Sequence, residues 1–263
     1  MAERFEILEK AILKMLEDKK YATLRDILVT MNPSDVAGLF EGLDEKQIPL
    51  MFRLLTKEQA AETFVEMDSD VQKRLILKLN DRELKEVLDE LFLDDTVDLI
   101  EEMPASVVKR ILKNVDSDTR KSINQLLSYP EDSAGSLMTI EFVDLRPGMT
   151  VEEAFDHIRQ HGVDKETIYT CYVTEGRKLI GLVTVKDLLL AEDDETKIED
   201  IMLTNLISVT THADQEEVAM MFSHYNFLAL PVVDKENRMV GIVTFDDAMD
   251  VMEEEATEDM EMM

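Results

Sequence analysis

The segments KLIGLVTVKD, residues 178–187, and RMVGIVTFDD, residues 238–247, follow one pattern and decide the fold of the C-terminal half. Each is an apolar run of strand length that contains one glycine and ends in Val-Thr, with an aspartate three residues after the threonine. A threonine followed by a carboxylate at that spacing is typical of a helix start. Each segment therefore predicts a strand that leads directly into a helix.

The same likeness extends upstream, so the two segments belong to a longer internal duplication. After Tyr129 and Pro130, strand-like apolar runs alternate with amphipathic helical stretches. The chain beyond residue 130 is therefore predicted to hold two α/β domains of one design, at 131–200 and 201–253. The matched pieces are 137–158 with 201–222, 168–173 with 228–233, and 178–187 with 238–247.

The N-terminal half carries a different repeat, in which an apolar anchor recurs at a spacing of 12. A residue that favours helix starts follows most anchors, for example Asn32, Thr56 and Asn80. Helices of about two turns cannot bury a face alone and must stack on neighbours. Residues 1–130 are thus predicted to form an all-α superhelical domain. The anchors are Met31, Leu43, Leu55, Met67, Leu79, Leu91, Met103, Val115 and Leu127.

One repeat is unusually acidic, because Asp94, Asp95 and Asp98 crowd behind Leu91. Residues three and four apart share a helix face, so these like charges repel one another. Placement at a helix N-terminus would reduce the cost through the helix dipole. A metal site is the other interpretation, and the sequence leaves both open.

The whole chain is strongly acidic, with 58 acidic and 28 basic residues among 263 and a formal net charge of −30. No basic residue follows Asp246. Such a charge excludes nucleic acid as a partner, since phosphates require a basic surface. The excess predicts either a solvated acidic surface or a need for counter-cations.

Other function classes are disfavoured by what the sequence lacks. No apolar run approaches the ~18 residues of a spanning helix, and the N-terminus has no apolar signal core. No nucleophile–base–acid set or Gly-rich phosphate loop is present. We therefore expect a non-enzymatic protein that is not exported.

Each copy of the duplication resembles a CBS domain, a β-α-β-β-α unit that pairs in tandem. The likeness rests on the Met-Thr-like start at Met138, the helix start at Thr150, and the Gly-hydrophobic-Val-Thr-x-x-Asp endings at Gly181 and Gly241. It is specific because every part occurs twice. The resemblance also implies a homodimer that forms through the CBS domains.

The flanking sequences add a second resemblance. PEDSAGSLMT (130–139) precedes the copies, EEEATED (253–259) follows them, and an acidic helical repeat lies upstream. This order is similar to the cytosolic region of MgtE family magnesium transporters. The expected fold is α+β: an N-terminal all-α superhelical repeat domain and a tandem pair of CBS domains, with residues 254–263 forming an acidic helical extension.

The MgtE resemblance implies a location and a missing part. Family members continue into a transmembrane bundle, and the acidic extension would lead toward it from the cytoplasmic side of the membrane. The chain would then be either a fragment of a transporter or a separately encoded subunit. Either way, the resemblance implies a regulatory domain whose partner is that transmembrane domain.

The resemblance also implies a set of Mg²⁺-sensing residues. Carboxylates suit this ion, because Mg²⁺ is hard, keeps several waters and takes one or two carboxylates. Two carboxylates about 4 Å apart repel by about 4 kcal/mol at an effective dielectric of about 20. Mg²⁺ between two acidic surfaces would turn this repulsion into a net attraction and favour a compact, pore-closing state. The implied residues are Glu62, Asp94, Asp98, Ser136, Glu216, Ser223, Asp247, Asp250, Glu255, Glu258 and Asp259. Asn226 departs from the aspartate that is common in the family.

A second expected ligand is an adenine nucleotide such as ATP, which CBS pairs often bind. The alternative is that the threonines and aspartates cap helices. A nucleotide sensor with incidental acids is thus one rival function, and a protein-interaction scaffold is another. The candidate nucleotide-binding residues are Thr184, Lys186, Asp187, Phe227, Pro231, Thr244 and Asp246.

Overall fold

The computed structural model describes residues 2–261, and it describes side chains for residues 8–253, Glu255 and Thr257. The chain divides into two compact units, which we describe separately. The helical unit comprises residues 1–91 and 95–121. The α/β unit comprises residues 92–94 and 122–263.

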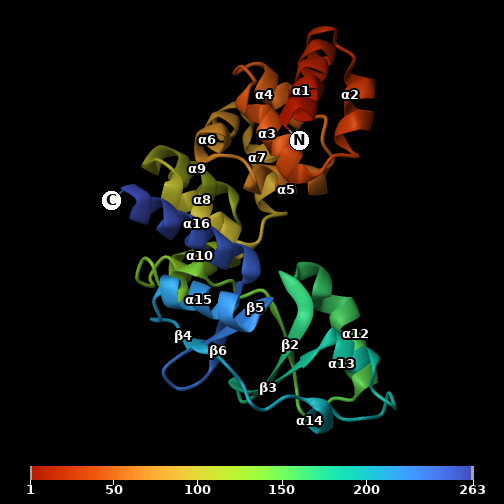
Figure 1. The fold of residues 1–263 in the computed structure, drawn as a ribbon, viewed down its shortest axis with the longest axis vertical. Coiled ribbons are helices and arrows are strands. Elements are labelled where there is room, and N and C mark those ends of the chain that lie inside the picture. The colour runs from red at the N-terminus through yellow and green to blue at the C-terminus, as the bar shows by residue number, and fades with distance from the viewer. Residues whose placement is uncertain (1, 262–263) are drawn as a thin grey trace. The chain divides into compact units, whose positions relative to one another are not determined.

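The helical unit is a stack of short helices (Figure 1, red to yellow), which confirms the predicted all-α N-terminal domain. Helix α10 crosses into the α/β unit. The helices are α1 (Ala2–Glu17), α2 (Tyr21–Leu28), α3 (Pro33–Glu41), α4 (Gln47–Phe52), α5 (Lys57–Val65), α6 (Ser69–Lys78), α7 (Asp81–Leu88), α8 (Leu93–Glu102), α9 (Ala105–Asn114) and α10 (Ser117–Leu126).

The predicted helix starts are visible in the capping contacts. The Asn32 side chain accepts a hydrogen bond from the Ser34 N–H at 3.0 Å. Asn80 and Glu83 form a reciprocal capping box. These contacts satisfy backbone groups that a helix end leaves without partners. The anchors that lie fully in the core are Leu43, Leu55, Met67, Leu79, Met103 and Val115.

Arg110 on α9 joins three elements of the helical unit. Its guanidinium donates to the carbonyl oxygens of Ile76 and Leu79, which lie at the end of α6. Its Nε also lies 3.2 Å from Asp81 Oδ1 at the start of α7. Because these carbonyls end a helix, the arginine satisfies acceptors that have no partner within α6.

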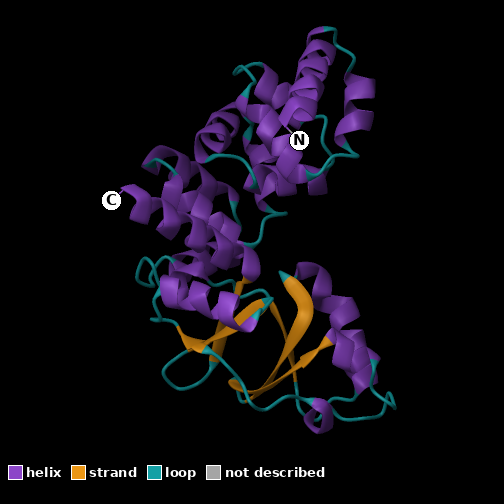
Figure 2. Ribbon diagram, viewed as in Figure 1, coloured by secondary structure: helices purple, strands orange, loops and turns teal. Residues whose placement is uncertain are grey.

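The α/β unit holds two three-stranded sheets of the same topology (Figure 2, orange strands). In each sheet the central strand is parallel to the first strand and antiparallel to the third. This order confirms the two predicted β-α-β-β-α units. Their elements are α11 (Ala134–Leu137), β1 (Phe142–Leu145), α12 (Val151–His161), a 3-10 turn (Gly162–Asp164), β2 (Thr167–Glu175), β3 (Lys178–Thr184), α13 (Val185–Leu189), α14 (Ile198–Ile201), β4 (Val209–Thr210), α15 (Gln215–Tyr225), β5 (Ala229–Val233), β6 (Met239–Thr244) and α16 (Phe245–Glu261).

The first segment of each repeat packs on the sheet of the other repeat. Thr139 pairs with Ile242 on β6, and Leu203 pairs with Leu182 on β3. A Cβ added to Gly241 would lie 2.7 Å from Met138 Sδ. A Cβ added to Gly181 would lie 2.5 Å from Met202 Sδ. The two glycines of the duplicated motif are therefore the places where the repeats interlock.

A shared core joins the two sheets. Tyr172 on β2 and Leu179 on β3 cluster with residues of β5 and β6. The Tyr172 ring also meets Phe142 edge-on, with ring centroids 5.9 Å apart. Within the described residues, no helix is both long enough and apolar enough to span a bilayer.

Candidate functional site

A group of predicted acidic ligands lies where β6 passes into α16. Asp247 Oδ2 accepts hydrogen bonds from Thr244 Oγ1 at 2.5 Å and from the Thr244 N–H at 3.3 Å. Asp246 and Asp250 are exposed on the same helix. Burial is the largest cause that raises the pKa of Asp247 to about 6, and the charges of Asp246 and Asp250 add to it. The site thus holds crowded carboxylates with one partly desolvated member.

The rest of α16 continues this acidic character. Glu255 is half-buried, two turns beyond Asp247. The predicted ligands Glu258 and Asp259 have side chains that lie outside the described residues. Residues 245–261 include no lysine or arginine, so the helix itself supplies no cation to these acids.

A second group of candidate residues lies on α15 and α11, which pack against each other. Glu216 and Ser223 are exposed on α15 and are two turns apart. The Glu216 N–H donates to Asp214 Oδ1 at 3.0 Å. On α11, Ser136 Oγ donates to the Ser133 carbonyl at 2.8 Å and accepts from the Ser133 N–H at 3.1 Å. The Ser136 hydroxyl therefore caps α11, and the contribution predicted for Ser136 and Ser223 is that of their main-chain oxygens.

Asn226, the departure from the family pattern, ends α15. It adopts the left-handed conformation with φ of 55°. Asparagine tolerates this conformation better than most residues and is common at helix C-termini. The structure therefore gives Asn226 a capping role, which its sequence context did not suggest.

The candidate ligands of the N-terminal half differ in exposure. Glu62 on α5 and Asp98 on α8 are exposed. Asp94 is buried, with 5 % of its surface exposed. Helix α8 begins at Leu93, so Asp94 lies in the first turn, where the helix dipole favours negative charge.

Sequence reasoning overlooked Glu141, which lies between α11 and β1. The Leu93 N–H donates to Glu141 Oε2 at 2.8 Å, and Thr139 Oγ1 donates to the same oxygen at 3.2 Å. Burial raises the pKa of Glu141 above its usual range. One feature of the sequence could have indicated this residue: Glu141 is an acid two residues after Thr139, in an otherwise apolar segment.

The predicted ligands could hold a hard cation such as Mg²⁺ only if water molecules complete its coordination. Carboxylate and main-chain carbonyl oxygens are suitable ligands for a hard cation. Across the side chains that the structure describes, no three His, Cys, Asp or Glu groups lie close enough together to hold a metal ion. A cation at Asp247 would therefore retain several waters, as Mg²⁺ usually does.

The candidate nucleotide residues occupy matching places in the two repeats. Thr184 caps α13 through a reciprocal box with Asp187, and Thr244 and Asp247 make the corresponding contact in the second repeat. The capping interpretation of this motif is therefore seen in both copies. Lys186 and Asp246 are exposed at the two helix starts.

Two further candidate nucleotide-binding residues, Phe227 and Pro231, belong to the second repeat. Phe227 stacks on Tyr225 with ring centroids 5.2 Å apart. Pro231 is buried on β5, opposite Ile242. The second repeat thus places an aromatic pair near the strand that ends at Thr244, whereas Pro231 is part of the sheet.

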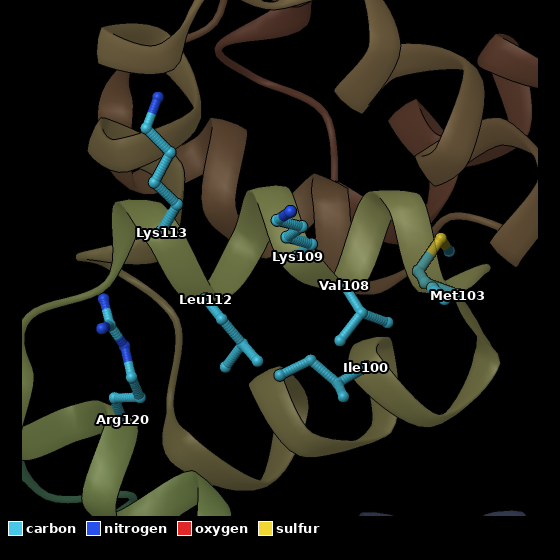
Figure 3. A pocket seen from close by; sticks show the side chains of 8 residues that line it. Ile100, Met103, Val108, Lys109, Leu112, Lys113 and Arg120 are labelled. Atoms are coloured by element: carbon cyan, nitrogen blue, oxygen red, sulfur yellow. The ribbon is translucent and has the colours of Figure 1, made fainter.

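A hollow of about 720 Å³ lies in the helical unit beside α8 and α9 (Figure 3). Ile100, Val108 and Leu112 point toward one another across it. Lys109 and Arg120 also line it. The hollow is lined by Met103, one of the predicted anchors, but by none of the predicted metal- or nucleotide-binding residues.

The fold and the acidic site define a CBS-domain protein with a helical domain preceding the CBS pair. The model of the MgtE intracellular N domain matches residues 31–132. The CBS domain model matches residues 134–194 and 198–254. The chain belongs to the MgtE family.

Curated relatives and solved structures agree with this assignment. The magnesium transporter MgtE of Thermus thermophilus is 38 % identical over 260 residues, which cover 97 % of this chain and 57 % of the relative. The Bacillus subtilis protein of the same name is 33 % identical over 95 % of this chain and 55 % of the relative. The chain thus spans little more than half the length of these relatives.

Two solved structures match nearly the whole chain with a TM-score of 0.86 each. One is the cytosolic domain of the Mg²⁺ channel MgtE in complex with ATP, 37 % identical, covering 92 % of this chain and 99 % of that one. The other is the soluble part of a magnesium transporter, 30 % identical, covering 96 % and 99 %. The chain therefore corresponds to the cytosolic domain of an MgtE protein.

Proposed function

We propose that this chain is the Mg²⁺-sensing regulatory domain of a magnesium transporter. Mg²⁺ binds between acidic surfaces of the N-terminal domain and the CBS domains and favours a compact state that closes the pore. The domain acts on the cytoplasmic side of the membrane, as a homodimer joined to the transmembrane domain of the same transporter. Its role is regulatory and not enzymatic.

The observation that carries this proposal is the state of Asp247. One oxygen of this carboxylate is bonded to Thr244, while burial and two neighbouring acids raise its pKa to about 6. Its charged form is therefore less favourable in the folded protein than that of an ordinary, exposed aspartate. A divalent cation would remove that cost, because an opposite charge at close range favours the ionised carboxylate.

The remaining proposed ligands extend the same charge excess. Asp250 and Glu255 lie further along α16, and Glu216 and Ser223 share a face of α15. Helices α15 and α16 pack against each other. The proposed complement from the N-terminal half of the sequence is Glu62, Asp94 and Asp98, of which Asp94 belongs to the α/β unit. Because each ion needs only one or two carboxylates, several weak sites can act together.

Calorimetric titration of the full chain with Mg²⁺ tests this function. We expect several weak binding events, and Asp247→Asn should remove or weaken at least one of them. Glu152→Gln is a matched control, since Glu152 is an exposed acid on α12 that is not one of the proposed ligands. Equal heats for the wild-type chain and Asp247→Asn would contradict the proposal.

We also propose that the CBS pair binds an adenine nucleotide such as ATP. Support comes from the relative that was solved in complex with ATP and from the Thr-x-x-Asp starts of α13 and α16. The hydroxyls that cap these helices can still accept a further hydrogen bond, because a hydroxyl has two lone pairs. Lys186, exposed beside Asp187, would meet a phosphate.

Titration with ATP in the presence of EDTA separates this ligand from Mg²⁺. Lys186→Ala should weaken ATP binding without changing the fold, because its side chain is exposed. Lys178→Ala, also an exposed lysine of the first repeat, should bind ATP normally. No heat with ATP, or equal loss in both variants, would contradict nucleotide binding and leave Mg²⁺ sensing untouched.

A further inference from the structure

The strongest cluster outside the sites described above is a pair of histidines on α12. His157 and His161 are four residues apart, so they lie on one face of the helix, one turn from each other. Their ring centroids are 4.7 Å apart, with an angle of 51° between the ring planes. His157 is half-buried and His161 is exposed. Both belong to the α/β unit.

The ring separation matches that of two imidazoles on one metal ion. A metal–nitrogen bond is about 2.1 Å, and a ring nitrogen lies about 1.1 Å from the ring centre, so a metal lies about 3.2 Å from each centroid. Ligand angles between about 90° and 109° then place the centroids about 4.5–5.2 Å apart. The observed 4.7 Å falls inside this range. The spacing of the rings therefore allows both to bind one metal ion once a nitrogen of each ring is turned toward it.

The local electrostatics favour the form of histidine that binds metals. Burial, and then the charge of His161, lowers the pKa of His157. Neutral imidazole is the form of histidine that binds a metal ion. The charged groups that act on His157 are Asp144, Lys165 and Arg146. Asp144 and Arg146 form an ion pair at 3.0 Å.

We propose that His157 and His161 form a two-histidine site for a transition-metal dication of the Zn²⁺, Ni²⁺ or Cu²⁺ class. Imidazole suits these metals, whereas Mg²⁺ prefers oxygen ligands. In the described part of the chain no third His, Cys, Asp or Glu joins the pair, so water completes the coordination. The site is chemically distinct from the acidic groups of α15 and α16 and does not rest on the proposed Mg²⁺ function.

The site would stabilise the end of α12. Helix α12 ends at His161, and Gly162 continues the chain into the 3-10 turn and then into β2. A metal that joins two successive turns acts as a clamp on the last turn of the helix. Binding to the folded state alone raises the stability by mass action.

The test is a titration of the full chain with Zn²⁺ in excess Mg²⁺, which keeps the carboxylates occupied. Imidazole ¹H–¹⁵N spectra should show the His157 and His161 signals shifting together and saturating at one equivalent. His161→Asn should weaken Zn²⁺ binding about tenfold or more, since chelation by the second ring is lost. His212→Asn and His224→Asn are the controls, because neither residue belongs to a histidine pair on α12.

Two outcomes would overturn the site. One is Zn²⁺ binding of equal strength in His161→Asn and the wild-type chain. The other is a shift of only one ring signal, or of the control histidines to the same degree. His157→Gln provides a second variant, and unchanged spectra outside α12 would show that each variant is folded.

Discussion

At the scale of single residues, Asp247 has the most informative chemistry. Its pKa is raised from 3.8 to about 6, mainly by burial. Between these two pH values, the folded protein therefore keeps a proton that the unfolded chain has already released. This carboxyl therefore contributes stability below about pH 4, and the contribution is lost as the pH rises toward 6.

Replacement by the neutral isostere should show the sign of this effect. In EDTA at pH 7, we expect Asp247→Asn to be more stable than the wild-type chain by on the order of 2 kcal/mol, since two pKa units correspond to about 3 kcal/mol. Denaturant unfolding at pH 4, 5, 6 and 7 measures it. The difference between the two proteins should grow with pH and vanish near pH 4. A variant that is less stable at pH 7 would refute the raised pKa.

Arg110 offers a residue-scale prediction in the helical unit. Arg110→Ala would leave the carbonyl oxygens of Ile76 and Leu79 without their donor and should destabilise the unit by about 1–3 kcal/mol. Lys113 pairs with the same Asp81 at 2.9 Å but is exposed, so Lys113→Ala should cost well under about 1 kcal/mol. Thermal unfolding of both variants compares them. Equal losses would show that the ion pair, and not the backbone contacts, is what matters.

At the scale of elements, sequence periodicity predicted the fold class well, because helices and strands are specified mainly by residues close together in the sequence. The spacing of anchors in 1–130 and the duplicated motif predicted the helical domain and the β-α-β-β-α order. The interlock of the repeats was not predictable in the same way. Which sheet Met138 and Met202 cover is decided by packing between segments far apart in the chain, and no local pattern records it.

The candidate site shows the same limit. The sequence shows that Asp247 is the aspartate of a Thr-x-x-Asp cap, but not that its side chain is partly buried beside two other acids. Glu141 was overlooked because its partner, the Leu93 N–H, lies in another part of the sequence. Asn226 was judged by its charge alone, whereas its backbone conformation, with φ of 55°, explains the residue.

The interlocking glycines give a prediction at the element scale. A Cβ on Gly241 would meet both the Thr139 carbonyl oxygen at 2.6 Å and Met138 Sδ, whereas on Gly181 the near atoms all belong to the flexible Met202 side chain. Overpacking costs about 1–3 kcal/mol. We expect Gly241→Ala near the upper end and Gly181→Ala near the lower end, by denaturant unfolding. Reversed or equal costs would show that the two copies interlock differently.

At the scale of the whole molecule, the proposed response to Mg²⁺ starts from the acidic excess. The formal net charge of −30 opposes any state that brings acidic surfaces together, and added Mg²⁺ should relieve that repulsion. Simple screening by salt would do so too, with little regard for the ion. Bound Mg²⁺ differs from screening, because it depends on particular carboxylates and on divalent charge.

Small-angle scattering across a Mg²⁺ titration distinguishes these possibilities. We expect the radius of gyration of the wild-type chain to fall as Mg²⁺ is added at constant ionic strength, and to recover with EDTA. Asp247→Asn should move the midpoint to about fivefold higher Mg²⁺ or beyond, since coupling of at least about 1 kcal/mol is lost with each site. Glu152→Gln removes the same charge from an exposed position on α12 and should leave the midpoint in place. If both variants shift alike, or if Na⁺ at matched ionic strength compacts the chain equally, the charge acts through screening and the specific Mg²⁺ site is refuted.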